Sequence, residues 1–125
     1  HNPQALQALR NTLEKDFSYD NLYLVLGVME DKEVDELLEI ILPISDYVFF
    51  TRPEYFRALS PQELETKASA FNKQGYRTET VHAALQAAEK QAGKNDMILI
   101  TGSLFTVGEA LTYLDPVEYA PDNLQ

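Results

Sequence analysis

The feature that most constrains the fold of this chain is the alternation of short apolar runs with amphipathic segments. Four runs have the length and composition of strands, at about 22–27, 46–51, 76–80 and 96–101. The first, "NLYLVLGV", is a continuous apolar run of the kind found in strands that are buried on both faces, and the last, "DMILIT", is the clearest strand. Strands that alternate with helices form parallel sheets with right-handed crossovers. The sequence therefore predicts an α/β fold, a mainly parallel sheet with helices on both faces.

Capping residues and prolines mark the expected helices. Asn2 and Pro3 fit the cap and the first position of a helix at the start of the chain. The segment Ser60-Pro61-Gln62-Glu63 is a capping box that starts a helix through about Lys73, stopped by Gly75. Further helices are expected within "DKEVDELLEIILPI", "HAALQAAEKQA" and "GSLFTVGEALTYL".

A length of 125 residues predicts one domain with its own core. We place the domain at 1–114 and expect the tail at 115–125, which has two prolines and no periodicity, to be extended or frayed. The chain starts on a histidine rather than a methionine, which indicates a trimmed or proteolysed start. Because a series of this kind alternates strand and helix, we expect a further central strand upstream of residue 1.

Composition excludes several classes of function. The absence of cysteine excludes disulfides, thiolate nucleophiles and cysteine metal sites. His1 and His82 are the two histidines, and their surroundings have no zinc-site spacing, so no metal ligands are assigned. A net charge of -10 disfavours nucleic acid as a partner. No apolar run approaches the ~20 residues of a membrane span, so no membrane partner is expected.

Candidate binding residues follow the predicted strands, because ligands of open α/β sheets bind at the carboxyl ends of the strands. These segments are 1–2, 27–32, 51–57, 80–82 and 101–103. Gly102-Ser103 opens a helix, whose free N–H groups can hold a carboxylate or phosphate; the alternative is a plain helix cap. Arg52 and Arg57 can clamp an anion, or be solvated or paired with Glu54.

No complete catalytic constellation is present, so no catalytic residue is assigned. The sequence contains neither G-x-x-x-x-G-K-[ST] nor G-x-G-x-x-G, which argues against an independent NTPase or dinucleotide site. The charged loop Glu30-Asp31-Lys32 is typical of a solvated turn. His82 beside an alanine-rich stripe is interpreted as structural or surface-exposed.

Four segments, in order along the chain, resemble motifs of folylpolyglutamate synthases in the wider Mur ligase superfamily. "HNPQAL" resembles the second half of Asp-Gly-Ala-His-Asn-Pro, and "LVLGVMEDKEV" resembles the Gly-x-x-x-Asp-Lys segment. "FFTRPEYFRAL" is similar to the Thr-x-Pro…Arg-Ala segment, and "ILITGSLFTVGEAL" to Thr-Gly-Ser-Leu-Tyr-x-Val-Gly. The last segment favours folylpolyglutamate synthase over the peptidoglycan ligases.

This resemblance implies the Rossmann-like C-terminal domain of a two-domain, cytoplasmic ligase. In such enzymes ATP activates a folate carboxylate as an acyl phosphate, which the amine of L-glutamate attacks; many bacterial members also join dihydropteroate to glutamate. The N-terminal P-loop domain of the same protein holds ATP, Mg²⁺ and folate, and the C-terminal domain closes over the nucleotide. No cofactor is expected for this chain alone, and it is expected to be inactive.

Carried over by motif, His1 and Asn2 should face the interdomain cleft near ATP and glutamate, with Ser103 at the same edge. Asp31, Lys32 and Arg57 are further candidates for substrate or nucleotide binding. The family's nucleotide-contacting Asp would precede His1. Phe105 replaces the commoner Tyr, which removes a hydroxyl contact.

Two alternatives stay open at this point. One is the C-terminal domain of a Mur-type cell-wall peptide ligase, and the other is a stand-alone α/β ligand-binding module such as a receiver-like domain. Receiver-like domains need clustered acidic residues at strand ends and a late lysine, whereas here single residues such as Asp31 occur. A P-loop and a folate-type loop upstream of His1 would decide between them.

Overall fold

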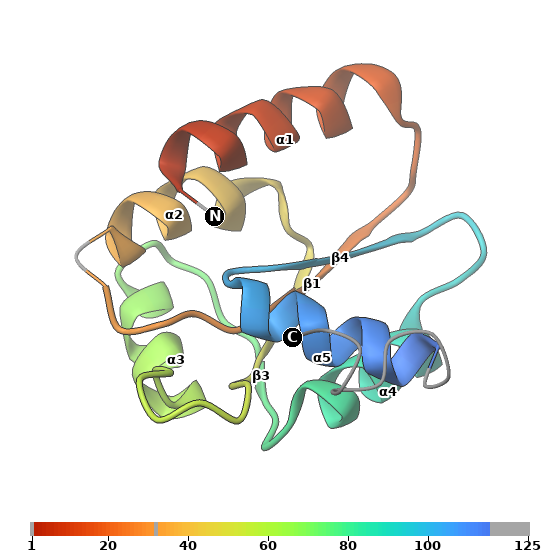
Figure 1. Ribbon diagram of the computed structural model, residues 1–125. Helices are drawn as coiled ribbons and strands as arrows, with labels where there is room; N and C mark the ends of the chain where they lie inside the picture. Colours follow the sequence, from red (N-terminus) through yellow and green to blue (C-terminus); the bar gives the residue numbers. More distant parts are fainter. Residues whose placement is uncertain (1, 32, 116–125) are drawn as a thin grey trace.

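The computed structural model describes residues 2–31 and 33–115. The predictions for His1, for Lys32 and for the tail from residue 116 onward therefore lie outside the described residues. Along the chain the elements are α1 (Pro3–Asp16), β1 (Leu22–Leu26), α2 (Val34–Ile41), the 3₁₀ turn η1 (Leu42–Ile44), β2 (Tyr47–Phe50), α3 (Pro61–Ser69), β3 (Tyr76–Arg77), α4 (Val81–Gln91), β4 (Met97–Thr101) and α5 (Leu104–Leu114) (Figure 1).

The strands form one parallel sheet in the order β3-β2-β1-β4. Leu24 in the centre of β1 lies opposite Val48 of β2 and Leu99 of β4. All five residues of β1 are buried, as the continuous apolar run predicted. The parallel α/β fold expected from the sequence is confirmed, and every described strand overlaps the range predicted for it.

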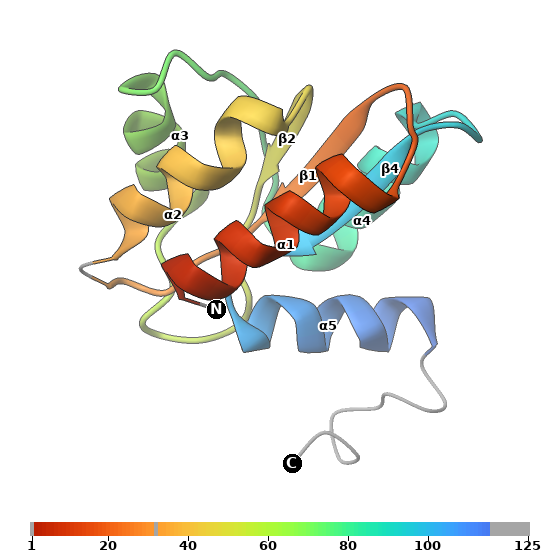
Figure 2. The same ribbon diagram turned by 90° about the horizontal axis from the view of Figure 1, so that it is seen from above.

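Helices cover both faces of the sheet (Figures 1 and 2). Leu24 and Leu26 of β1 belong to a core shared with α1, α2 and α3. Tyr23 and Val25, which point to the opposite face, belong to a second core with α4 and α5. Alternate side chains of the central strand thus contribute to two hydrophobic cores, one on each face of the sheet. These cores hold the helices, and the loops that lead into the helices, in place.

The predicted caps are present, although two boundaries differ. The Asn2 side chain accepts a 2.8 Å hydrogen bond from the Ala5 N–H, and Ser60 and Glu63 form the expected capping box. The helix α3 ends at Ser69, so the expectation that it runs to Lys73 and is stopped by Gly75 is wrong. Gly75 is needed for another reason, since a Cβ there would overlap the Val48 carbonyl oxygen.

The strand expected at 76–80 is limited to Tyr76–Arg77. Thr78 uses its N–H and its hydroxyl to bond the Phe50 carbonyl, and Thr80 caps α4 by accepting a bond from the Ala83 N–H. Both threonines therefore lead from the strand into the next helix. Within the described ranges, no helix is both long and apolar enough to span a bilayer.

Candidate functional site

The loops that follow β1 and β4 meet at the carboxyl edge of the sheet through two glycines. Gly102 has φ +120°, a conformation that side chains disfavour, and a Cβ there would overlap the Gly27 carbonyl group. This close approach is possible only without a side chain at position 102. It places the first turn of α5 directly against the loop that leaves the central strand.

Ser103 caps α5 and is 5% exposed. Its Oγ accepts a 3.0 Å hydrogen bond from the Thr106 N–H and lies 2.9 Å from Thr106 Oγ1. Thr106 Oγ1 donates its single proton to the Gly27 carbonyl oxygen at 2.7 Å, so Ser103 must be the donor in the contact between the two hydroxyls. The Ser103 hydroxyl therefore has only acceptor capacity left for a ligand.

The first turn of α5 still offers donors for an anion. An α-helix leaves the N–H groups of its first turn without intrahelical partners, and Ser103 satisfies only that of Thr106. The N–H groups of Leu104 and Phe105 belong to this turn, where the helix dipole favours negative charge. A carboxylate or phosphate at this edge would be held by the backbone, with Ser103 fixing the direction of the turn.

Asp31 and Ser103 line the same hollow, of about 190 Å³. The other lining residues come from the loop after β1, from α2 and from the start of α5: Val28, Met29, Glu33, Leu37, Gly102, Leu104 and Phe105. Asp31 Oδ1 accepts a 2.8 Å hydrogen bond from the Glu33 N–H, which fixes the carboxylate at the start of α2. Two of the predicted site residues are thus brought together.

A second hollow, of about 130 Å³, adjoins the first through Leu37 and Gly102. It lies beside α1 and includes Ala5, whose N–H is bonded by the Asn2 side chain. Asn2 therefore caps the helix that borders this edge, and its carboxamide oxygen is engaged by the cap. The described part of the site runs from Asn2, past Gly102, to Ser103 and Asp31.

The loop after β2 is fastened to the same edge. The Glu30 N–H donates a 2.7 Å hydrogen bond to the Arg57 carbonyl oxygen, and Met29 forms a bridge with Ala58. Arg57 is exposed, so its guanidinium is available beside the loop that carries Asp31.

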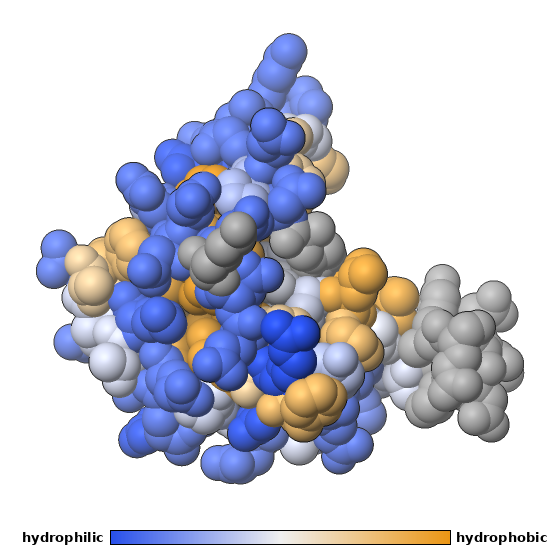
Figure 3. Space-filling view, turned by 60° about the vertical axis from the view of Figure 1, so that its left-hand side comes forward, coloured by the Kyte–Doolittle hydropathy of each residue, from blue (hydrophilic) through white to orange (hydrophobic). Residues whose placement is uncertain are grey.

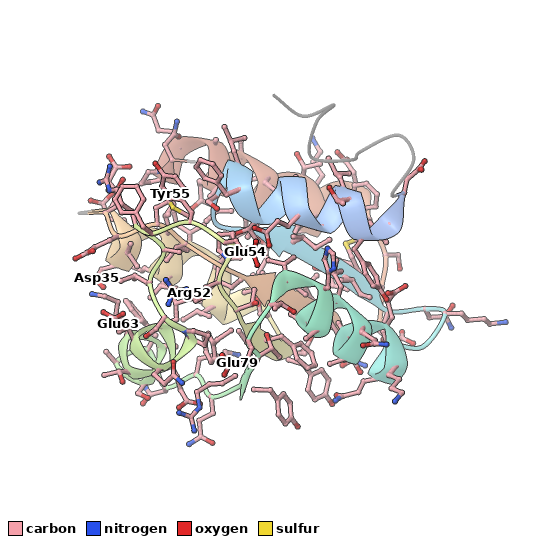
Figure 4. All side chains as sticks on the ribbon, turned by 60° about the horizontal axis from the view of Figure 1, so that its bottom comes forward. Asp35, Arg52, Glu54, Tyr55, Glu63 and Glu79 are labelled. Carbon is pink, nitrogen blue, oxygen red and sulfur yellow. The ribbon has the colours of Figure 1, made fainter. Side chains whose placement is uncertain are left out.

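Arg52 has different surroundings from Arg57. The pKa of Glu63 is lowered chiefly by its hydrogen bonds with Ser60 in the capping box, and the positive charge of Arg52 lowers it further. Figure 4 shows Arg52, Glu54, Tyr55 and Glu63 among the labelled side chains of this region. Arg52 therefore lies near the start of α3, and both the anion clamp and the pair with Glu54 stay predictions.

Sequence reasoning missed Glu109. Its Oε2 accepts a 2.6 Å hydrogen bond from the Glu54 N–H, which ties the loop after β2 to α5. Burial raises the pKa of Glu109 and the charge of Glu54 raises it further, whereas the Glu54 N–H bond and His82 oppose the shift. A lone glutamate in a helix is usually a solvated residue, but Glu109 lies one turn after Phe105, on the face toward this loop.

His82 is exposed, and its ring centroid lies 5.4 Å from that of Tyr113. This supports its interpretation as a structural or surface residue. With Glu54, Thr80, Glu109 and Thr112 it lines a hollow of about 370 Å³ on the other side of α5. In the described ranges no group of three or more His, Cys, Asp and Glu side chains has the arrangement of a metal site.

Comparison with known families decides the assignment of this fold. A model described as "Mur ligase, glutamate ligase domain" matches residues 1–104. The chain belongs to this family. The match includes Asn2, Asp31, Arg57 and Ser103, and it confirms the resemblance drawn from the four sequence segments.

Relatives of this glutamate ligase domain carry consistent names. A Halobacterium salinarum protein, "Probable bifunctional folylpolyglutamate synthase/dihydropteroate synthase", is 34% identical over 116 residues, which are 90% of this chain and 14% of that protein. A Mycobacterium tuberculosis "Dihydrofolate synthase/folylpolyglutamate synthase" is 32% identical over 127 residues, which cover 90% of this chain and 26% of that protein. The domain thus spans about a quarter or less of the length of these relatives.

Solved structures give the same picture. Folylpolyglutamate synthase from Mycobacterium tuberculosis, complexed with ADP and AMPPCP, is 31% identical with a TM-score of 0.81, over 92% of this chain and 28% of that chain. E. coli FolC in complex with DHPP and ADP has a TM-score of 0.85 at 23% identity, over 94% of this chain and 28% of that chain. This similarity shows that the two share a fold. The domain therefore shares the fold of about a quarter of each of these solved chains.

Proposed function

We propose that this domain is the C-terminal part of an ATP-dependent ligase that adds L-glutamate to folate through an acyl phosphate. The observation that carries the proposal is the identity of 31–34% with proteins named folylpolyglutamate synthase over at least 90% of the chain. Joining dihydropteroate to glutamate is a second activity of the same enzyme, in line with the dihydrofolate synthase in the names of several relatives. The proposed location is the cytoplasm.

The carboxyl edge supplies one wall of the cleft in which the reaction takes place. In this proposal the N–H groups at the start of α5 bind the carboxylate of the incoming glutamate, and Ser103 keeps them oriented through its cap. The Asp31 carboxylate in the same hollow can accept hydrogen bonds from the glutamate ammonium group. Asn2 and Arg57 border this wall, and by motif His1 and Lys32 belong to it as well.

We assign the binding of ATP and Mg²⁺ mainly to an N-terminal P-loop domain of the same protein. A phosphate chain is normally cradled by a P-loop, which this sequence lacks, and the described residues do not form a three-ligand metal cluster. Bound ATP supplies the phosphoryl group that activates the folate carboxylate. An N-terminal P-loop domain of the same protein would hold it, and this domain would cover it and position glutamate.

The test is a product analysis with the full-length ligase. The protein is incubated with ATP, Mg²⁺ and L-glutamate, and with either dihydropteroate, a reduced folate or a cell-wall precursor peptide. The proposal predicts that ADP release requires a pterin substrate and that mass spectrometry finds this substrate extended by one glutamyl residue. Amino-acid addition to the cell-wall precursor alone would support the Mur-type peptide ligase instead.

A further inference from the structure

Four side chains from two segments gather at the carboxyl edge, three of them exposed and Tyr55 half-buried. We call this surface the aromatic patch; it consists of Tyr55, Phe56, Leu104 and Phe105. Phe56 is 84% exposed, Leu104 76% and Phe105 47%. The Tyr55 ring stacks on Phe105 with centroids 4.2 Å apart and contacts the Phe56 ring at 5.0 Å. The loop after β2 and the start of α5 therefore present one surface.

The size of the aromatic patch distinguishes it from scattered surface residues. Since an aromatic side chain offers about 150–250 Å², the exposed fractions of Phe56 and Phe105 correspond to roughly 200–330 Å² of surface, to which the exposed Leu104 adds. Patches of this size on soluble domains commonly mark interaction sites. Figure 3 views the molecule from the side of the carboxyl edge, where hydrophobic areas lie among hydrophilic ones.

The aromatic patch is held rigid before anything binds to it. The Glu54 N–H is bonded to Glu109 on α5 at 2.6 Å, and the Arg57 carbonyl accepts a bond from the Glu30 N–H at 2.7 Å. The backbone on either side of Tyr55 and Phe56 is thus pinned to two neighbouring elements. Binding of a partner would therefore lose little conformational entropy, because the loop is already ordered.

We propose that the aromatic patch docks onto an apolar surface of the ATP-binding part of the same ligase chain. This inference rests on the proposed function. Leu104 and Phe105 also line the hollow that contains Asp31 and Ser103, so a domain that docks here closes against the candidate site. Docking through the aromatic patch would set the distance between the two walls of the cleft.

Area favours a partner in the same chain over a separate molecule. A stable complex between separate proteins buries about 800 Å² on each partner, which is more than the aromatic patch offers. A covalently linked partner has an effective concentration in the millimolar range, at which a small apolar contact is sufficient. The domain spans only 14–28% of its relatives, which leaves ample chain to provide that partner.

The test uses the full-length ligase without substrates. One dye is attached at Gln62→Cys, an exposed position on α3, and a second dye is attached in the remainder of the chain. Single-molecule energy transfer between the two dyes then gives the ratio of docked to undocked molecules. The variants are Phe56→Ser and Leu104→Ser, whose side chains are 84% and 76% exposed and lie outside both hydrophobic cores. The matched control is Phe17→Ser, a 53% exposed phenylalanine between α1 and β1.

The docked-to-undocked ratio should fall at least about tenfold in Phe56→Ser and in Leu104→Ser and stay unchanged in Phe17→Ser. An unchanged ratio in both patch variants would overturn the proposal. A second outcome would also overturn it: the wild-type ligase sediments as a dimer, and Phe56→Ser is a monomer with an unchanged docked-to-undocked ratio. In that case a second copy of the chain, and not the ATP-binding part, would cover the aromatic patch. Failure of glutamate transfer alone would refute the proposed function and leave this readout intact.

Discussion

The Thr106 hydroxyl donates a 2.7 Å hydrogen bond to the carbonyl oxygen of Gly27, which lies 79 residues earlier in the chain. Thr106 is completely buried, and the same hydroxyl accepts from Ser103. One side chain therefore links Gly27, which follows the central strand, to Ser103, which caps α5 and lines the hollow of the candidate site. Changes at this position should report on the integrity of the whole carboxyl edge.

Replacing Thr106 by valine keeps the shape of the side chain and removes its hydroxyl. Gly27 and Ser103 each lose a buried partner, so the free energy of unfolding should fall by about 1–3 kcal/mol. Urea unfolding of the wild type and Thr106→Val measures the difference. Thr106→Ser, which keeps the hydroxyl, should lose clearly less, and equal losses in the two variants would show that the hydrogen bonds contribute little.

The contact between Gly102 and Gly27 predicts a strong effect of a single methyl group. Gly102→Ala introduces a Cβ against the Gly27 carbonyl at φ +120°, and should destabilise the domain by more than about 1 kcal/mol. At Gly93 a Cβ would lie 3.4 Å from the Asp96 carboxylate, an ordinary contact. Gly93→Ala should therefore change the free energy of unfolding by no more than about 0.5 kcal/mol in the same unfolding experiment.

Glu109 predicts a pH dependence of stability. Burial and the nearby Glu54 raise its pKa above the ordinary 4.5, against the Glu54 N–H bond and His82. Its contribution is then fully present below pH 4.5 and is lost as the pH rises through the raised pKa. Glu109→Gln keeps an oxygen for the Glu54 N–H and removes the charge.

The wild type should therefore gain stability relative to Glu109→Gln as the pH falls from neutrality through this window. The measurement is the free energy of unfolding of both proteins at a series of pH values. A difference between them that does not vary with pH would contradict the assigned pKa shift.

The 125-residue chain by itself should bind ATP only weakly. One wall of a cleft leaves most of a nucleotide in water, whereas effective pockets bury most of their ligand. We expect a Kd in the millimolar range or weaker, equivalent to about -4 kcal/mol. Isothermal calorimetry or an NMR titration tests this, and micromolar binding would mean that the domain holds the nucleotide on its own.

The sequence predicted the parts of the fold that depend on local chemistry. Apolar runs indicated β1 and β4, and the caps at Asn2 and Ser60 were found because their partners lie within one helical turn. The strand at 76–80 was overestimated because Thr78 and Thr80 have favourable strand propensity but are used in turn and cap bonds. Propensity cannot show which partner a hydroxyl will find.

The candidate site could be predicted only in outline. The carboxyl-edge rule placed Asp31 and Ser103 at the same edge, and both line one hollow. The links from Thr106 to Gly27 and from Glu109 to Glu54 depend on the order of strands and on the path of α5, so no local spacing indicates them. Ser103 was identified as a cap or a ligand residue, and its remaining acceptor capacity became clear only from its contacts.

The most direct test of the account is the glutamate kinetics of Ser103→Ala in the full-length ligase. The account places the start of α5 at the glutamate, so loss of the Ser103 cap should raise the KM for glutamate more than the KM for ATP. Thr80→Ala is the matched control, because it removes an equivalent cap from α4 outside the hollow that contains Asp31. A raised glutamate KM in Ser103→Ala alone is the predicted result; unchanged glutamate kinetics, or equal effects of the two variants, would contradict it.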